Sequence, residues 1–255
     1  MNRKNSLSHM LYIACVIILA SGCAAIRPET DPTLDKKALA FAKKAKSYNQ
    51  HIITSKGTAW ATLRTGTKYE KFKIAWAASF PNKIRITFLI SANPIETIIA
   101  TGEKITFISH TGAHSRKSYN SKDPDMEKYI NVPIKISEMI LILLGRLPVK
   151  NFDDTYFAPS DPLLSTIVLR QNGKPTAKYL HYNDNKNCDT LWLEDYNKTL
   201  VYKMETNTYK IFGSDNIPAR LEIKDNNNRK LTLEITNFIS NPSIKESVFQ
   251  LTDHG

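Results

Sequence analysis

Two histidines are the first residues in this 255-residue chain whose spacing suggests chemistry. His110 and His114 are four positions apart, the spacing at which a helix would bring both imidazoles to one metal ion. Gly112 lies between them, and a glycine there makes a helix unfavourable. No pair of cysteines with metal-ligand spacing accompanies them. We therefore predict no metal site.

Paired carboxylates are the second group that could do chemistry. Asp123 with Asp125, and Asp153 with Asp154, could act as acid and base, but polar neighbours indicate solvated loops. The chain contains no Gly-x-Ser-x-Gly, no His-Glu-x-x-His and no glycine-rich phosphate loop. We predict no catalytic residues and a protein that is not an enzyme. Because catalytic residues can lie far apart in a sequence, an enzyme acting on lipid or glycan stays open as an alternative.

The first 22 residues have the pattern of an export signal. Arg3 and Lys4 precede an apolar run over 10–19, which is shorter than the roughly 20 residues that span a bilayer. Small residues and a cysteine follow this run. The pattern predicts a secretory signal peptide over residues 1–22.

The five residues that end at Cys23, Leu-Ala-Ser-Gly-Cys, resemble the lipobox of bacterial lipoproteins. Ala20 stands where the lipobox usually has leucine, and Leu19 lies one position earlier. The resemblance implies that Cys23 carries diacylglycerol and an N-acyl chain, and no other cofactor is expected. An ordinary signal peptide, cut nearby, would leave Cys23 unmodified. The lipobox interpretation predicts a lipidated tether over residues 23–30, and residues 31–255 are predicted to form one domain.

Charge limits the classes of partner that the protein can bind, and the cysteine content shows whether disulfides can stabilise it. The formal net charge is +11, and a basic surface attracts nucleic acid, anionic lipid headgroups or acidic proteins. Because an exported lipoprotein is kept from nucleic acid, we predict no nucleic-acid partner and favour lipid headgroups or an acidic partner. A generally lysine-rich proteome would explain the charge equally well. Cys15 leaves with the signal and Cys188 remains alone, so no intramolecular disulfide is expected.

Two helices are predicted. Asp31 and Pro32 suit the N-cap and first position of a helix, and apolar residues follow at helical spacing from Leu34 to Tyr48. Because this stripe is rich in alanine, we favour packing against a sheet over lying on a membrane surface. The segment 136–144 is apolar nearly all round, so as a helix it must be buried or face an apolar cavity.

From position 52 onward, short segments rich in Ile, Thr, Val, Phe and Tyr alternate with turn residues. Alternating polar and apolar residues within them are typical of strands with one buried face. The polar segment 111–132 is predicted as a loop. The fold class is mainly β with helices (α+β), built on a curved antiparallel sheet. Strands are predicted near 53–65, 69–78, 83–90, 96–101, 104–109, 164–170, 176–183, 189–194, 199–205, 208–212, 218–224 and 230–237.

The order of these elements over residues 50–240 resembles a known family. It is similar to the outer-membrane lipoprotein receptor LolB and the LolA-like superfamily. The resemblance implies an unclosed β-barrel with helices covering its open side. The residues that carry it are the strand ending at Trp76, Lys83 to Ile90 running into Asn93-Pro94-Ile95-Glu96, the helix over 136–144 followed by Gly145-Arg146-Leu147-Pro148-Val149, and Ile217-Pro218-Ala219-Arg220-Leu221-Glu222-Ile223 before the last strand.

The resemblance also implies a function. In the family, an apolar cavity accepts the acyl chains of lipoproteins, and a loop with an apolar tip passes cargo to the membrane. Here the loop matches Ser91 to Glu96 with Ile95 at its membrane-facing tip, although Glu96 replaces the usual glycine. The implied protein is a monomeric, lipid-anchored carrier that receives lipoproteins or lipids from a LolA-like donor. Ala24, in place of the Asp that retains lipoproteins in the inner membrane, favours the periplasmic face of the outer membrane.

Nine inward-facing residues are candidates for the cavity wall or its lid. An apolar cavity takes up acyl chains by burying their surface and needs no catalytic group. The same residues suit an ordinary packed core, and alternation alone does not distinguish the two. An envelope lipoprotein with a structural or sensing role, acting through protein–protein contacts, is the alternative function and predicts a filled interior. The candidates are Trp76, Ile84, Ile86, Phe88, Ile98, Met139, Ile140, Leu143 and Leu144.

Overall fold

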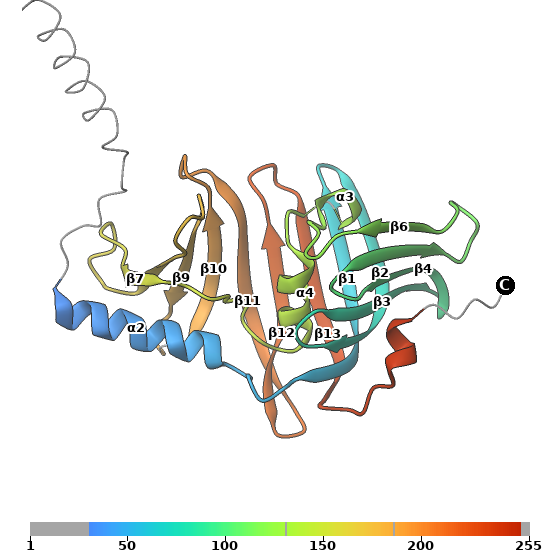
Figure 1. The fold of residues 1–255 in the computed structure, drawn as a ribbon, viewed down its shortest axis with the longest axis horizontal. Coiled ribbons are helices and arrows are strands. Elements are labelled where there is room, and N and C mark those ends of the chain that lie inside the picture. Colours follow the sequence, from blue (N-terminus) through green and yellow to red (C-terminus); the bar gives the residue numbers. More distant parts are fainter. Residues whose placement is uncertain (1–30, 131, 186, 251–255) are drawn as a thin grey trace, which may run out of the picture. The chain divides into compact units, whose positions relative to one another are not determined.

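The segments rich in β-branched and aromatic residues form the strands of one sheet. Such residues fit a pleated surface that is buried on one face, and Gly, Asn and Asp supply the turns. The computed structural model describes residues 31–130, 132–185 and 187–250, which are shown in Figure 1. The strands are β1 (Thr54–Thr65), β2 (Lys68–Ser79), β3 (Lys83–Ile90), β4 (Asn93–Ala100), β5 (Lys104–Ser109), β6 (Lys117–Asn120), β7 (Asp154–Phe157), β8 (Thr166–Arg170), β9 (Ala177–Tyr182), β10 (Cys188–Glu194), β11 (Leu200–Phe212), β12 (Asp215–Lys224) and β13 (Lys230–Ser240).

The sheet has 13 strands in the order β6-β5-β4-β3-β2-β1-β13-β12-β11-β10-β9-β8-β7. All pairs of neighbouring strands are antiparallel. The series β1 to β6 and the series β7 to β13 are joined where β1 pairs with β13. Because β6 and β7 stand at opposite ends of the order, the sheet does not close into a barrel. This confirms the predicted fold class.

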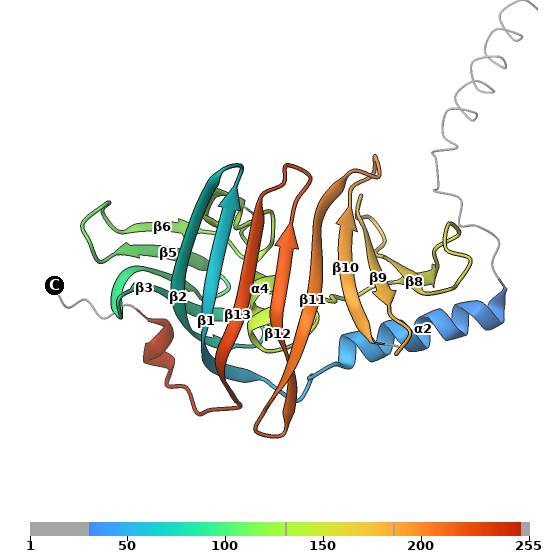
Figure 2. The same cartoon turned by 180° about the vertical axis from the view of Figure 1, so that it is seen from behind.

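The sheet curls around helix α4 (Ile136–Leu143). In Figure 1, strands β3 to β6 run across the direction of β11 to β13, so the strand direction turns strongly along the sheet. Helix α4 lies in front of β12 and β13 in Figure 1 and behind the strands in Figure 2, which places it on one face of the sheet. A second short helix, α3 (Glu127–Ile130), precedes it in the chain.

Helix α2 (Pro32–Ser47) packs on β7 and β8 in the other half of the sheet. Its fully buried residues are the alanines at 38, 42 and 45, whose small side chains let the helix backbone approach the strands. The ring of Phe41 lies 4.9 Å from that of Tyr182, and the Tyr182 hydroxyl donates to the Phe41 carbonyl at 2.6 Å. These contacts confirm the prediction that this helix packs against a sheet.

Three local predictions were wrong. The segment 111–132 contains β6 and α3 rather than a loop alone, because Tyr119 pairs with Ile105 at the sheet edge and the ring of Tyr129 stacks on that of Phe107. The segments 199–205 and 208–212 are one strand, β11, in which a bulge around Thr206 and Thr208 absorbs the polar interruption without ending the ladder. The short strand β7 lies where none was predicted.

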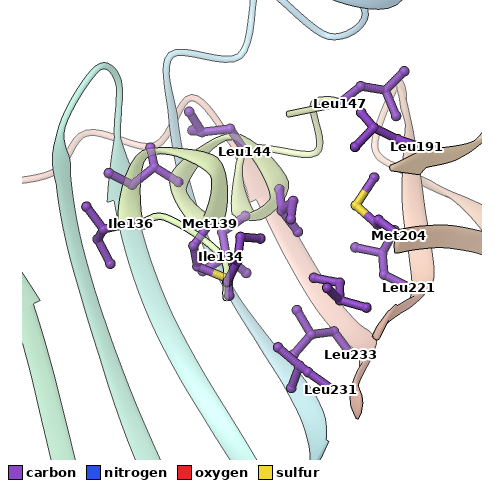
Figure 3. Packing of buried hydrophobic residues seen from close by; sticks show 14 of the residues in the cluster. Ile134, Ile136, Met139, Leu144, Leu147, Leu191, Met204, Leu221, Leu231 and Leu233 are labelled. Atoms are coloured by element: carbon purple, nitrogen blue, oxygen red, sulfur yellow. The ribbon is translucent and has the colours of Figure 1, made fainter. Parts of the chain in front are cut away.

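The core of the protein lies between α4 and the strands. Figure 3 shows side chains of α4 and its flanking residues directed toward those of β10 to β13, so that both form one apolar cluster. Polar contacts fix the end of α4: Ser55 Oγ donates to the Leu143 carbonyl at 2.6 Å, and Trp76 Nε1 donates to Ser55 Oγ at 3.0 Å. The helix is thus attached to β1 and β2 by hydrogen bonds as well as by packing.

The described residues from Pro32 onward form one compact unit, which holds their whole hydrophobic core. A short 3₁₀-helix, η1 (Glu246–Phe249), follows the last strand. Among the described residues, no helix combines the length and the apolar character needed to cross a membrane. The predicted signal peptide, the lipidated Cys23 and the tether over 23–30 lie outside the described residues.

Candidate functional site

The nine predicted cavity residues divide into two groups. Phe88 and Ile98 line an open cavity, and Phe88 is only half-buried. The other seven lie at most 5% exposed within the hydrophobic core, where α4 fills the space that the sheet encloses. These seven side chains therefore have the environment of the packed core that the sequence left open as the alternative to a cavity wall. They are Trp76, Ile84, Ile86, Met139, Ile140, Leu143 and Leu144.

The open cavity encloses about 420 Å³ and is formed by β1 to β6 together with α3. We call it the aromatic pocket, because five of its thirteen lining residues carry aromatic rings of the Phe and Tyr type. Its position at one end of the curled sheet follows from the order of the strands, which brings β1 to β6 side by side. Its lining residues are Leu63, Glu70, Phe72, Phe88, Ile95, Glu96, Ile98, Phe107, His114, Lys117, Tyr119, Tyr129 and Ile130.

The rings of the aromatic pocket contact one another in pairs. Phe72 and Phe88 meet edge to face with their centroids 5.6 Å apart. Phe107 stacks on Tyr129 at 3.9 Å and meets the edge of Tyr119 at 6.3 Å. Tyr119 and Tyr129 come from the segment predicted as a loop, and their presence in an otherwise polar stretch was the one signal that could have revealed them. Such paired rings make a stable apolar wall.

Polar and charged groups accompany the rings. His114 Nε2 lies 3.0 Å from Glu96 Oε2 and 3.2 Å from Glu96 Oε1, and each of the two side chains is 26% exposed. Glu70 and Lys117 also line the pocket. This polar set remains in contact with water, whereas the rings offer an apolar surface. The pocket therefore suits a ligand with an apolar chain and has no arrangement of nucleophile and base.

Ile95 is not at the tip of its hairpin, which corrects the predicted placement. Phe88 pairs with Glu96 and Leu89 pairs with Pro94, so Ile95 is the extra residue of a β-bulge. It is half-buried and lines the aromatic pocket. A role for Ile95 at a membrane stays a prediction.

The turn between β3 and β4 consists of Ser91 and Ala92, both with positive φ, as in the two-residue turns that match strand twist. The exposed apolar side chain next to this turn is Ile90, which is 54% exposed. If this hairpin presents an apolar residue to a membrane, the geometry favours Ile90 over Ile95.

A buried ion pair fastens α4 to the strands opposite the pocket. Lys178 Nζ lies 2.6 Å from Glu138 Oε1 and donates to the Pro148 carbonyl at 2.7 Å, while the Tyr202 hydroxyl donates to Glu138 Oε1 at 2.8 Å. Burial acts to raise the pKa of Glu138, but the Lys178 charge and the hydrogen bonds outweigh it and hold that pKa below its ordinary value. Glu138 is therefore ionised at neutral pH.

Cys188 lies in a different cavity, between α2 and β9 to β12, of about 230 Å³. Burial first, and the charge of Asp189 second, raise the pKa of the Cys188 thiol to about 12. Such a thiol stays protonated and unreactive at neutral pH. Within the described part of the chain, no three His, Cys, Asp or Glu side chains are grouped as metal ligands.

Comparison with known proteins supports the fold. No known protein family and no curated protein matches the sequence. Among solved structures, a DUF1329 family protein from Desulfovibrio piger has a TM-score of 0.63 and 8% identity, covering 87% of this chain and 98% of its own. A domain assigned to outer-membrane lipoprotein sorting from Vibrio parahaemolyticus has a TM-score of 0.59 and 8% identity, with 85% and 97% covered.

A LolA superfamily protein from Nitrosomonas europaea is also similar, with a TM-score of 0.56 and 8% identity over 84% of this chain and 97% of that protein. Identities this low show a shared fold and not a shared activity. Together with the unclosed antiparallel sheet and its covering helices, these likenesses confirm the resemblance predicted from the sequence. The chain has the fold of the LolA-like superfamily.

Proposed function

We propose that this protein is a lipid-anchored carrier or receptor of the cell envelope that binds acyl chains and delivers them to the outer membrane. The observation that carries the proposal is the aromatic pocket, an apolar cavity of about 420 Å³ at one end of the curled sheet. Sites for small ligands typically have volumes of about 300–1,000 Å³ and are mostly apolar. The likeness to a LolA superfamily protein and to a lipoprotein-sorting domain supports a carrier of lipids or lipoproteins.

Binding in this pocket requires only the burial of apolar surface. Each Å² of apolar surface removed from water contributes about 25 cal/mol, so a chain lying on the rings of Phe72, Phe88 and Phe107 gains affinity without any covalent step. Release to a membrane then requires only that the bilayer offers the chain a comparable environment. The polar pair of Glu96 and His114 orients the ligand, because an acyl chain avoids charged groups.

The test is the affinity for a fluorescent acyl probe, measured on the protein from residue 24 onward. The variant Phe88→Glu places a charge in the pocket wall and is expected to weaken binding at least tenfold, or about 1.4 kcal/mol. Phe212 is also half-buried but lies outside the aromatic pocket, so Phe212→Glu is the matched control. The control should bind the probe like the parent protein, and melting temperatures should show that both variants are folded.

Two results would contradict the proposal. Equal affinity of the parent protein and Phe88→Glu would remove the aromatic pocket from the mechanism. A parent protein that binds neither acyl probe nor lipopeptide would favour the second candidate, a structural or sensing lipoprotein that acts through protein contacts. The packed core beneath α4 favours that candidate in one respect, since it predicts a filled interior.

The lipid anchor is proposed from the sequence around Cys23. Mass spectrometry of the N-terminal peptide of the protein purified from bacterial membranes is expected to show Cys23 as the first residue, with diacylglycerol and one N-acyl chain attached. Several acyl chains hold a protein stably at a membrane, because each buried CH₂ contributes about 0.8 kcal/mol. An unmodified peptide that begins elsewhere would show an ordinary signal peptide and remove the anchor.

A further inference from the structure

A second cavity, which we call the basic groove, shares no residue with the aromatic pocket. It encloses about 460 Å³ between the end of α2, the turn between β2 and β3, the outer side of α4 and the segment that follows α4. Part of its lining is apolar, with Phe80, Leu141 and Val149. The rest is mostly polar and includes Lys46, Lys122 and Arg146. A cavity with both kinds of lining suits a ligand that has an apolar part and a negative charge.

Among the described residues, Arg146 is a buried cation without a carboxylate partner. It is 7% exposed, and its Nη2 donates to the carbonyls of Gln50 and Ile52, both at 2.6 Å. Its guanidinium lies 4.9 Å from the centre of the Phe80 ring. None of the ion pairs among the described residues includes Arg146. Its Nε is buried and has no hydrogen-bond partner among them.

This arrangement has an electrostatic consequence. A buried charge without a counterion costs free energy, and burial accordingly lowers the pKa of Arg146. An anion entering the groove would offset that cost through its charge, because Arg146 lines the cavity. The two hydrogen bonds to main-chain carbonyls hold the guanidinium in place before any ligand arrives, so little ordering is needed on binding.

Positive charge exceeds negative charge in the lining of the groove. Lys46, Lys122, Lys150 and Arg146 are opposed by one carboxylate, Asp123. Lys150 Nζ lies 3.0 Å from Asp123 Oδ2, so these two charges compensate each other. Four cations less one anion leave three positive charges facing a cavity that also has apolar walls.

We propose that the basic groove binds the anionic headgroup of a lipid, a phosphate or comparable oxyanion attached to an acyl chain. The headgroup would lie against Arg146, Lys46 and Lys122, and the first part of the chain against Phe80 and Leu141. The lipid nature of the ligand rests on the proposed carrier function, whereas the preference for an anion rests on the groove itself. The protein would thus select negatively charged lipids rather than accept any acyl chain.

Three matched probes test this inference by titration calorimetry below their micelle concentrations. Lauroyl lysophosphatidic acid has the charge and the chain, monolauroylglycerol has the same chain without phosphate, and glycerol 3-phosphate has the headgroup without the chain. The protein from residue 24 onward is expected to bind the lysophosphatidic acid at least tenfold more tightly than monolauroylglycerol, and added salt should reduce this ratio. Glycerol 3-phosphate should bind more weakly than the lysophosphatidic acid.

The variant pair tests the groove directly. Lys46→Gln with Lys122→Gln is expected to reduce the preference for the charged lipid severalfold, with Arg146 supplying what remains, and to leave the affinity for monolauroylglycerol unchanged. Lys36→Gln with Lys43→Gln removes the same charge from exposed positions outside the groove and should keep the preference. These four lysines are all exposed, so folding is not at risk, and Arg146 stays in place.

Each contrary outcome has a distinct meaning. Equal affinities for the two lipids, or a preference that is undiminished by the loss of Lys46 and Lys122, would overturn the groove as an anion site. Glycerol 3-phosphate binding as tightly as the lysophosphatidic acid would show a site for free oxyanions and overturn the lipid assignment. If monolauroylglycerol fails to bind while the charged lipid binds with the expected charge dependence, the aromatic pocket fails and the basic groove stands.

Discussion

The variant Lys178→Met is expected to lose about 3–5 kcal/mol of the free energy of unfolding at neutral pH, measured by urea denaturation. Lys178 and Glu138 are both buried and joined at 2.6 Å, and Glu138 belongs to α4. Removing the ammonium leaves the carboxylate buried, with the Tyr202 hydroxyl and the main-chain N–H of Lys135 as its remaining donors among the described residues. Breaking one partner of a buried pair costs far more than the pair contributes, because the other charge stays uncompensated.

The pH dependence of this loss has a definite sign. In the parent protein the pKa of Glu138 is held below its ordinary 4.5, so the ion pair stabilises the fold above about pH 4.5. That stabilisation is lost as the pH falls through the lowered pKa. In Lys178→Met the strongest influence that opposes burial is gone, so burial is expected to raise the pKa of Glu138, and acid then neutralises the orphaned carboxylate. The difference in stability between parent and variant should therefore shrink from pH 7 toward pH 4.

The double variant Lys178→Met with Glu138→Gln is the control. It removes both charges and keeps an acceptor for the Tyr202 hydroxyl, so it should recover most of the lost stability. If Lys178→Met is as stable as the parent at pH 7, the two side chains are not paired in a buried site. If the double variant is no more stable than the single variant, packing rather than charge holds α4 in place.

The variant Leu143→Ala is expected to lose about 2–5 kcal/mol of the free energy of unfolding, while its affinity for the acyl probe stays unchanged. Leu143 is fully buried on α4 and contributes to the core against which the strands pack. Truncating a core leucine removes buried methyl groups and leaves a cavity that the surroundings refill only in part. Thermal or urea denaturation gives the stability, and probe titration gives the affinity.

Phe88→Ala is the matched comparison on the wall of the aromatic pocket. Because Phe88 is half-buried and already borders open space, its truncation should cost less stability than Leu143→Ala but weaken probe binding. The reverse pattern, in which Leu143→Ala weakens binding at little cost in stability, would mean that the space under α4 is the binding cavity. The two variants together decide whether the interior beneath α4 is a packed core or the ligand-binding cavity.

The inward and outward faces of the strands could be read from the sequence. The alternation in β3 correctly predicted that Ile84 and Ile86 point inward, and the apolar segment 136–144 correctly predicted a buried helix. These features depend on the two-residue period of a strand and on the all-apolar surface of a helix, both of which are local. The order of the elements was also enough to predict the superfamily fold.

Whether the space inside the curled sheet is packed or open depended on tertiary structure. Ile84 and Ile98 are both buried strand residues, yet of the two only Ile98 borders the aromatic pocket, because α4 covers one part of the sheet and leaves another part open. The position of Ile95 depended on its pairing with β3, where a bulge turned the predicted loop tip into a pocket residue. Neither the coverage by α4 nor the bulge at Ile95 can be predicted from the residue types alone.

The pairing of charged side chains could not be predicted from the sequence. Glu138 and Lys178 are 40 residues apart and meet only because β9 passes beside α4. Arg146 has no carboxylate partner in the described part of the chain, because the fold places the carbonyls of Gln50 and Ile52 beside its guanidinium. Local periodicity and the order of the elements were enough to predict most of the strands, the buried helix and the LolA-like fold. The tertiary structure alone decided which apolar residues form a core or a pocket and which charges are paired, because both depend on contacts between segments distant in the chain.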